Sequence, residues 1–526
     1  MPPVSSPPPP TPRTPAAATA PPRPTRAARL RFAGWALLVI AILAGNLAFA
    51  AGGGRHEVTL AIALWPVVGL AVLGVAGLLA TTPPDAIRLS RRSGETIVLL
   101  GTVALTTAVW AGWHPALSSD LLRYRLDGEM SLSGASPWAT APEQWRNTRG
   151  YFNRTSDPFL DAVTPYAEIK SIYPPGAQAL FLATAKLSAA WLASSDGGRP
   201  RFVPEAATVI WHGDKGTLVA AHAAALRGAA AAAVVITAGL LLWALRTMDR
   251  SPWYALLYAW SPLVVVESAG QGHVDALGAM FLAASAASAV RGRLALSAVA
   301  LAAATAVKPH VVVVAPALVA WAWHAAPAAP GRWRRPAVVA AVFGVCAVAA
   351  YAPLLLSTED WQGWRQTVDV YAMSWEANGS IYELICAPFR AGDGRALADA
   401  KIAARLLGGV AAFVSLYLVM RRRLPLVDAA YWLTLVPLLF APVVYPWYLM
   451  WGLAVVPLLR RTGGWTLLTW AATSGLSYQL LNEPVWRLPA GWALAQYVPV
   501  YAALAWELAG LRRPAAADAE LTAPGR

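Results

Sequence analysis

Long apolar runs separated by short polar segments make up most of the chain. The first run covers 32–51 and is long enough to cross a bilayer, because a membrane-spanning helix needs about 20 apolar residues. The pattern predicts an all-α polytopic integral membrane protein, a bundle of about 12–14 transmembrane helices with a large extracytoplasmic first loop. The further runs expected to form helices are 58–80, 96–112, 216–245, 252–268, 272–290, 293–307, 309–324, 336–356, 398–420, 426–443, 446–460, 464–481 and 490–511.

The composition agrees with a membrane protein and argues against nucleic-acid binding. Of the 526 residues 57% are hydrophobic and 13% are charged, whereas a soluble domain has about 25% charged residues. The net charge of +14 comes from basic residues in short clusters between apolar runs, as in cytoplasmic loops. The two cysteines, Cys346 and Cys386, imply neither a disulfide framework nor a CxxC metal site.

The chain divides into two tails and one membrane domain. Residues 1–28 are rich in Pro and Ala and contain no acidic residue, so we expect a disordered cytoplasmic tail. Residues 29–513 are expected to form the transmembrane domain, with outer loops at about 113–173 and 357–397. Residues 514–526 are expected to be a second cytoplasmic tail.

The segment 173–192 decides the orientation of all later helices. It is apolar enough to cross but opens with two prolines and a glycine. With a cytoplasmic N-terminus, a full crossing would place nearly every later basic cluster outside, against the positive-inside rule. We therefore expect the segment to enter and return, although an extra crossing within 195–245 would give the same orientation. The clusters that then lie inside are Arg246, Arg250, Arg291, Arg293, Arg332, Arg334, Arg335, Arg421 to Arg423, Arg460, Arg461, Arg512 and Arg513.

This orientation places the unusual polar motifs on the outer face. The stretch 113–138 carries the most charge, with three acidic and two basic residues between Asp120 and Glu129. Ionisable residues at a membrane boundary are costly, so a functional role is expected unless they pair within the bundle. The other outer motifs are QGHVD (271–275), KPH (308–310), the loop 357–397, YPWY (445–448) and LNEPVWR (481–487).

The order of these motifs resembles a known family. SSDLLRYRLDG and SGASPW, followed by SIYPPG, GQGHVDAL, AVKP, NGSIYELI and YPWYLMW, are similar to bacterial GT-C glycosyltransferases that use polyprenyl-phosphate sugars, especially actinobacterial mannosyltransferases. The similarity covers about 95–485. It implies a GT-C-like fold with its catalytic domain at 29–513 and an active site on the extracytoplasmic face of the cell membrane.

The acidic residue that matches the family's catalytic base is Asp120. Transfer of a sugar to a hydroxyl needs a base near that hydroxyl. The alternative is that Asp120, with its two preceding serines, caps a helix. Asp127 lies two helical turns further on and could contact an acceptor or tune Asp120, or it could pair with Arg123 at i and i+4.

A phosphate-linked donor also needs cations. Lys308 and His310 are candidates at an outer boundary, and Arg123 is a further candidate, because a positioned cation stabilises charge that develops on a phosphate. His273 could bind a sugar or pair with Asp275 or Glu267, and Asp275 could likewise contact the acceptor.

Aromatic and amide side chains complete the predicted site. Tyr445 and Trp447 could stack on a sugar or line a lipid groove, and Tyr173 and Asn378 belong to motifs of the resemblance. The alternative for the aromatic residues is an interfacial belt of Trp and Tyr. No DxD pair, phosphate loop or metal-ligand cluster is evident.

The resemblance implies an inverting hexosyltransferase, with mannose as the favoured sugar. Polyprenyl phosphate would carry the donor, a glycan or glycolipid would be the acceptor, and neither a cofactor nor a metal is expected. The bilayer is the other partner. The alternative function is a lipid-linked glycan flippase or a solute transporter, since such proteins share the same composition.

Overall fold

The computed structural model describes residues 26–52, 57–81, 89–113, 115–148, 166–194, 216–325, 330–392, 394–460 and 463–511. Nearly all of the two predicted tails, and 149–165 of the first outer loop, lie outside the described residues. Within these ranges the chain is helical, and its only β pairing is a pair of isolated bridges from 377 and 378 to Val443. The prediction of an all-α polytopic protein is confirmed.

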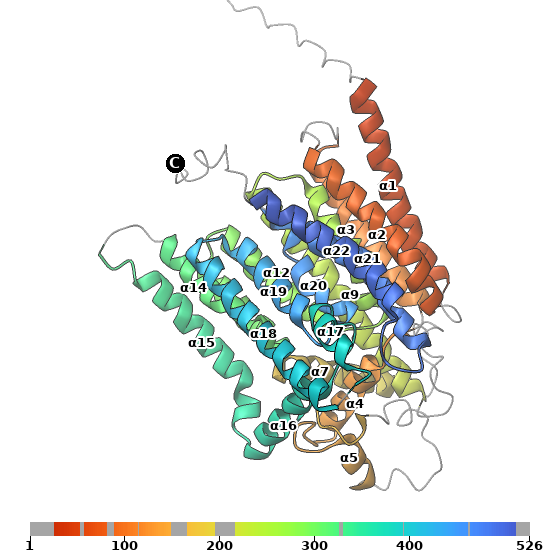
Figure 1. Cartoon of the computed structure of the whole chain (residues 1–526), viewed down its shortest axis with the longest axis vertical. Coiled ribbons are helices and arrows are strands. Elements are labelled where there is room, and N and C mark those ends of the chain that lie inside the picture. The colour runs from red at the N-terminus through yellow and green to blue at the C-terminus, as the bar shows by residue number, and fades with distance from the viewer. Residues whose placement is uncertain are drawn as a thin grey trace, which may run out of the picture.

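Within the described residues, six helices are long and apolar enough to cross a membrane. Most of the helices run roughly side by side in one bundle (Figure 1). The six are α1 (Arg26–Ala51), α2 (Glu57–Thr81), α3 (Arg91–Gly112), α9 (Gly216–Thr247), α15 (Arg334–Leu355) and α18 (Gly394–Arg421). Shorter helices pack among these six: α12 (Asp275–Val290), α13 (Leu294–Val307), α14 (Ala315–His324), α19 (Leu426–Phe440) and α21 (Trp465–Thr473). The last helix of the described chain is α22 (Ala490–Leu511).

Several of the described runs that we expected to be single helices are divided into shorter elements, and two of them lie deep in the bundle. Residues 252–268 form the short helices η3 (Pro252–Ala255), α10 (Leu256–Ala259), α11 (Pro262–Val265) and η4 (Val266–Gly270). Pro252 and Pro262 are the first residues of η3 and α11. Pro262 prevents α10 from continuing, because proline lacks an amide hydrogen and clashes with the preceding turn. Nearly all of these residues are buried. Broken helices are tolerated at membrane depth only where protein surrounds them.

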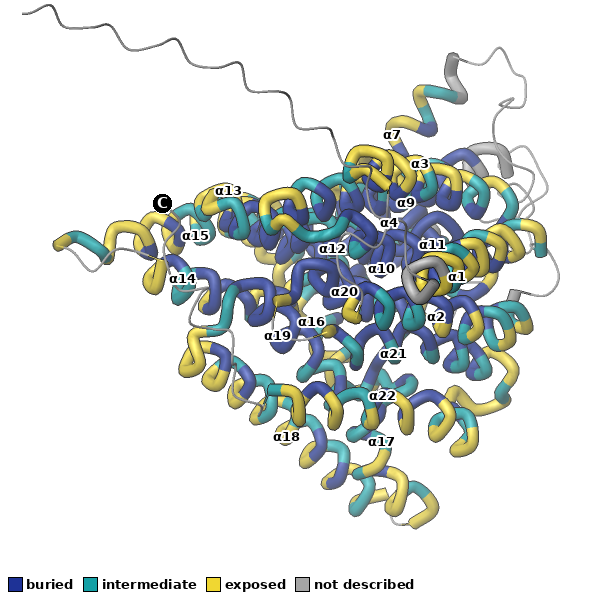
Figure 2. The backbone as a smooth tube through the Cα atoms, turned by 90° about the horizontal axis from the view of Figure 1, so that it is seen from above, coloured by how far each residue is buried: buried dark blue, intermediate teal, exposed yellow. Residues whose placement is uncertain are grey.

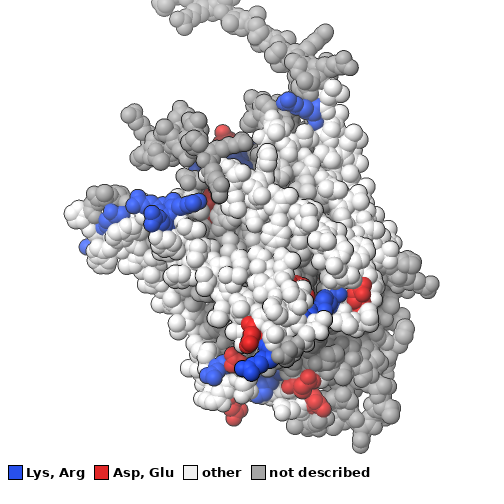
Figure 3. All heavy atoms as spheres, in the orientation of Figure 1, with Lys and Arg blue, Asp and Glu red and all other residues white. Residues whose placement is uncertain are grey.

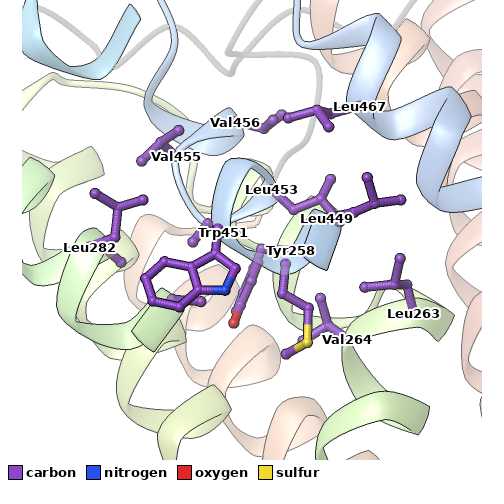
Figure 4. Close-up of a cluster of buried hydrophobic side chains, with 14 of the residues drawn as sticks. Tyr258, Leu263, Val264, Leu282, Leu449, Trp451, Leu453, Val455, Val456 and Leu467 are labelled. Atoms are coloured by element: carbon purple, nitrogen blue, oxygen red, sulfur yellow. The ribbon is translucent and has the colours of Figure 1, made fainter. Parts of the chain in front are cut away.

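The second broken run lies in the centre of the bundle. Residues 446–460 form η7 (Pro446–Tyr448), α20 (Leu449–Leu453) and η8 (Val456–Leu458). The buried side chains of α20 interleave with those of α11 and α12 (Figure 4). Trp451 is fully buried there, and a Cβ at Gly278 of α12 would lie 2.0 Å from its ring. Glycine therefore lets α12 approach the indole closely.

Burial falls from the centre of the bundle to its rim. Figure 2 shows buried backbone around α12 and α20, and exposed residues along α1, α15 and α18. The exposed side chains of α18 include Leu406, Val410 and Phe413. Large apolar side chains exposed along a helix of this length face lipid in a membrane protein.

The basic clusters expected inside that fall within the described residues gather toward one end of the bundle (Figure 3). Arg91 pairs with Asp249 at 2.9 Å, and Arg246 pairs with Glu95. Arg250 donates to the carbonyl of Leu459 at 2.6 Å. Basic side chains also gather where α14 and α15 meet, whereas both signs of charge appear at the opposite end, around α16 (Thr358–Ser374) (Figure 3).

The helix α7 (Pro175–Ser194) packs near that opposite end. Gly176 lies against the end of α13, since a Cβ there would be 2.6 Å from the carbonyl oxygen of Ala306. Thr184 contacts His222, in the second turn of α9, at 3.1 Å. The contacts thus hold the first half of α7 beside the outer ends of its neighbours. That 173–192 does not cross stays a prediction.

Gly278→Ala should destabilise the bundle. The added methyl group overlaps the buried Trp451 ring, and overpacking of this kind costs about 1–3 kcal/mol. We expect a lower midpoint when the detergent-solubilised protein is heated and its monodisperse fraction is measured. Gly239→Ala in α9, where nothing lies within 4 Å of the new Cβ, is the matched control and should not lower it. Equal midpoints would contradict the packing described here.

Candidate functional site

A cavity of about 1110 Å³ opens among the residues predicted to face outward. Its polar end includes Asp120, Lys170 and Lys308, and the ring of Trp447 forms part of its wall. A second part of the lining is apolar and lies between α18 and α19, at Gly408, Leu433, Pro437, Leu438 and Phe440. The cavity therefore has a charged end near Asp120 and a largely apolar part between α18 and α19, here called the apolar arm.

Asp120 is the first residue of α4 (Asp120–Leu132). Its amide donates to Ser118 Oγ at 3.1 Å, and a carboxylate is favourable at this end of a helix. The hydroxyls of Tyr124 and Tyr173 donate to Asp120 Oδ2 at 3.2 and 3.3 Å. Burial raises the pKa of both phenols well above 10, so both remain protonated donors. The carboxylate is about 30% exposed and lines the cavity.

Asp127 is held in a closed polar cluster. It is fully buried and pairs with Arg123 Nε at 2.8 Å, as the i and i+4 spacing allows. Ser171 and Gln178 donate to its other oxygen at 2.5 and 2.8 Å. Arg123 also donates to the carbonyl of Ile169 at 2.9 Å. Asp127 does not line the cavity, whereas Arg123 does.

His273 connects the cavity wall to a buried carboxylate. Its Nδ1 lies 2.9 Å from Glu267, and its Nε2 lies 3.9 Å from Asp120. The imidazole stacks on Trp447 with ring centroids 3.8 Å apart. Of the two partners expected for His273, the structure brings Glu267 and not Asp275 into contact. Tyr478 donates a hydrogen bond to the same glutamate.

Asp275 neutralises Lys308. The ammonium lies 2.8 Å from both carboxylate oxygens, and Trp451 Nε1 donates to Asp275 at 2.8 Å. The same ammonium lies 4.4 Å from the centre of the Tyr448 ring. His310 lines the cavity and packs on Trp451 at 4.8 Å. Lys308 therefore borders the cavity with its charge already balanced.

Three of the four other predicted contact residues lie at the cavity. Tyr445 and Trp447 stack with centroids 4.6 Å apart, and Tyr173 packs edge-on against Tyr124 at 5.0 Å. Asn378 does not line it. Its φ is +52°, its side chain donates to Val444 O at 3.2 Å, and its carbonyl accepts from Tyr497. Asn378 thus connects the outer loop to the bundle.

The outer loop beside the cavity is held by a charge network. Glu376 pairs with Lys401 at 2.5 Å and with Arg390 at 2.9 Å, and Tyr382 donates to it at 3.1 Å. Burial opposes ionisation of Glu376, but its hydrogen bonds to Lys401 and Arg390 outweigh burial and lower its pKa below 4.5. Arg390 also pairs with Glu383. The network closes the turn between α16 and α17 (Ile381–Cys386).

Arg227 supports the site and was not singled out in the sequence. It is fully buried in α9 and donates to the carbonyls of Val109 and Trp113 at 3.1 and 2.9 Å, and to Ala269 at 2.9 Å. In the described part of the chain no carboxylate pairs with it. An arginine within a long apolar run is the signal that could have identified it.

Gly272 shows how tightly this arginine is enclosed. Its φ is +76°, and a Cβ there would lie 3.0 Å from Arg227 Cγ and 2.9 Å from Leu121.

The described ranges contain no cluster of three or more side chains suited to bind a metal ion. The polar and charged side chains at the cavity can donate and accept hydrogen bonds and form ion pairs.

Residues 223–376 match the family described as PIG-U, a GPI transamidase subunit. The matched part is less than a third of the chain. No match was found among curated proteins. The family is one of multi-pass membrane proteins related to the GT-C-like fold, so the resemblance holds at that level, and nothing supports the actinobacterial mannosyltransferases in particular.

The match overturns one prediction. We expected the chain to be a hexosyltransferase, and this is wrong, because the matched family is described as a GPI transamidase subunit and not as a mannosyltransferase. The physical reason is that motifs of charged and aromatic residues at outer helix ends report a shared architecture, whereas one architecture carries unrelated functions. The role of Asp120 stays a prediction.

Asp127→Asn should destabilise the protein more than Asp120→Asn. Asp127 is buried against Arg123, and leaving one member of a buried pair uncompensated costs about 3–5 kcal/mol. Asp120 is partly exposed, so its replacement should change stability by about 0.5 kcal/mol or less. Thermal midpoints of the two variants in the same detergent measure the difference. A larger loss for Asp120→Asn would show that Asp127 is not a structural residue.

The outer loop should loosen in acid. Because the pKa of Glu376 is lowered on folding, its stabilisation is present above the ordinary value of 4.5 and is lost as pH falls through the lower folded value. Limited proteolysis of the loop should therefore accelerate below about pH 4.5. Glu376→Gln should be cleaved faster at neutral pH and should lose this pH dependence. A profile identical to wild type would exclude Glu376 as the titrating group.

Proposed function

We propose that this protein is a membrane-embedded glycolipid-binding subunit. It receives the phosphate-linked glycan head of a lipid at the polar end of the cavity and the lipid chain in the apolar arm. The matched family is described as a subunit of an enzyme that acts with a glycolipid, GPI, which agrees with a binding role. Partner subunits would carry out the chemistry.

The observation that carries this proposal is the shape of the cavity. Its charged end at Asp120 is continuous with an arm lined by Leu433, Pro437 and Leu438 of α19. A soluble sugar would leave the arm empty, and a simple lipid would offer no polar group to Asp120 and Lys170 at the other end. An amphiphile with a glycan head matches both parts.

The side chains at the polar end suit a sugar. Asp120 accepts hydrogen bonds through an oxygen already oriented by two phenols, so it can accept from a glycan hydroxyl. The stacked rings of Tyr445 and Trp447 offer apolar faces to a pyranose ring. The binding role of Asp120 replaces the catalytic role that the resemblance implied.

The charge distribution supports an extracytoplasmic location for this end, in a cell membrane. The opposite end of the bundle carries the basic clusters around Arg91, Arg246 and Arg250. Such clusters remain on the cytoplasmic side of membrane proteins. The glycolipid head would then bind outside the cytoplasm.

Glycolipid binding can be measured directly in phosphatidylcholine nanodiscs. Wild-type protein titrated with a polyprenyl-phosphate hexose and a phosphatidylinositol-linked glycan should bind at least one of them. Asp120→Asn should weaken that binding about 5- to 30-fold, because a hydrogen bond to a charged group is worth about 1–2 kcal/mol more than one to a neutral group.

Asp369→Asn is the matched control, since Asp369 is 67% exposed on α16 and lies outside the cavity lining. Its binding should equal that of wild type. Absence of binding to either lipid would overturn the proposal. Movement of the labelled lipid across the bilayer by the protein alone would favour the flippase alternative instead.

A further inference from the structure

Four Lys and Arg side chains line the described cavity, and three of them are already engaged. Arg123 pairs with Asp127, and Lys308 pairs with both oxygens of Asp275. Arg405 donates to the carbonyls of Ala372 and Met373, both at 2.9 Å, at the end of α16. These three cations are used by the protein itself.

Lys170 is the fourth. Across the part of the chain that the structure describes, no hydrogen bond or ion pair holds its ammonium. A charge that borders a largely apolar cavity without a counterion attracts an anion more strongly than one that is already paired, because the low dielectric screens it less. Lys170 is therefore the cation with capacity to bind a ligand.

The backbone around Lys170 is fixed on both sides. The amide of Ser171 donates to Pro137 O at 2.8 Å, and the carbonyl of Ile169 accepts from Arg123 at 2.9 Å. Trp364 Nε1 donates to Ile172 O at 2.9 Å, and Trp138 Nε1 donates to Tyr173 O at 2.8 Å. These bonds hold 169–173 in place, so little ordering entropy is lost when a ligand binds.

The stem of Lys170 passes over a glycine that leaves room for it. A Cβ at Gly363 of α16 would lie 2.9 Å from Lys170 Cδ and 1.9 Å from Trp138 O. Any larger residue at 363 would displace the Lys170 stem or push α16 away from the backbone at Trp138. The close approach brings Lys170 to the same cavity wall as Trp364 and Thr367 of α16.

We propose that Lys170 binds the phosphate of the lipid ligand, and that Lys308 instead serves to hold Asp275. This inference rests on the proposed glycolipid binding. It names a phosphate monoester or diester as the group recognised, since a lysine ammonium is a compact point charge suited to phosphate oxygens. Asp120 and Lys170 would then contact different parts of one ligand head, the sugar hydroxyls and the phosphate.

The test uses three probes with full-length protein in phosphatidylcholine nanodiscs: farnesyl phosphate, farnesol and inorganic phosphate. Wild type should bind farnesyl phosphate more tightly than farnesol. Lys170→Ala should weaken the binding of farnesyl phosphate about 10- to 100-fold, which is the value of a hydrogen-bonded charge pair. The affinity for farnesol should stay within about twofold of wild type. Lys170→Arg should keep most of the wild-type affinity for farnesyl phosphate, because it keeps the charge.

Lys186→Ala is the matched control, since Lys186 is an exposed lysine of α7 that does not line the cavity. It should bind all three probes as wild type does. Stronger binding of farnesyl phosphate than of inorganic phosphate would identify the lipid-linked ester as the ligand, whereas equal binding of the two would point to free phosphate and overturn the lipid assignment.

Two failures can be told apart. If wild type binds neither farnesol nor farnesyl phosphate, both the glycolipid proposal and the role of Lys170 are wrong. If both probes bind but Lys170→Ala weakens them equally, or not at all, the cavity still binds lipid and only the assignment of Lys170 is wrong. A loss in Lys308→Ala that exceeds the loss in Lys170→Ala, with thermal midpoints unchanged, would move the phosphate site to Lys308.

Discussion

The buried guanidinium of Arg227 is the constraint on which the site depends. It joins the end of α3, through Val109 and Trp113, to the carbonyl of Ala269 in η4. The end of α3 leads into α4, which begins at Asp120, and His273 follows η4 closely in the chain. A buried charge needs such partners, because an uncompensated one is very costly. The partners of Arg227 are backbone carbonyls at helix C-terminal ends, where the helix dipole is negative.

Pairing of charges then decides what the cavity can recognise. Asp127, Asp275 and Glu267 are buried and each has a basic or imidazole neighbour. These pairs fix the positions of α4, α12 and the segment after η4. Among the described residues of the lining, Asp120 keeps a partly exposed carboxylate, and no ion pair holds the ammonium of Lys170. Pairing thus leaves few charges of the described lining open to a ligand.

The sequence pattern predicted the helices at the rim of the bundle better than those at its centre. The runs that became α2, α15 and α18 face lipid on one side, so their length and apolar character alone identify them. The runs 252–268 and 446–460 are also apolar but divide into several short helical elements. Neighbouring helices satisfy and shield their backbone, and hydropathy does not report such shielding.

The sequence predicted only part of the candidate site, because some of its contacts are local in the chain and others join distant helices. Spacing made the pair of Arg123 and Asp127 one of the roles expected for Asp127, because i and i+4 residues share a helix face, and the structure shows this pair. The pairing of Lys308 with Asp275 joins residues far apart in the chain, and so does the contact of His273 with Trp447. The expected hexosyltransferase activity was wrong because motif order reports a shared architecture, and one architecture carries unrelated functions.

The sequence by itself determined the all-α membrane architecture and the gathering of basic clusters at one end, because both follow from local transfer free energies between lipid and water. It also determined which outer segments carry polar motifs. Only the tertiary structure decided which of those charges are neutralised, because ion pairing depends on distances of about 3 Å between helices that are remote in sequence. Lys170 and Lys308 have the same side chain, and only their neighbours in the folded chain distinguish them.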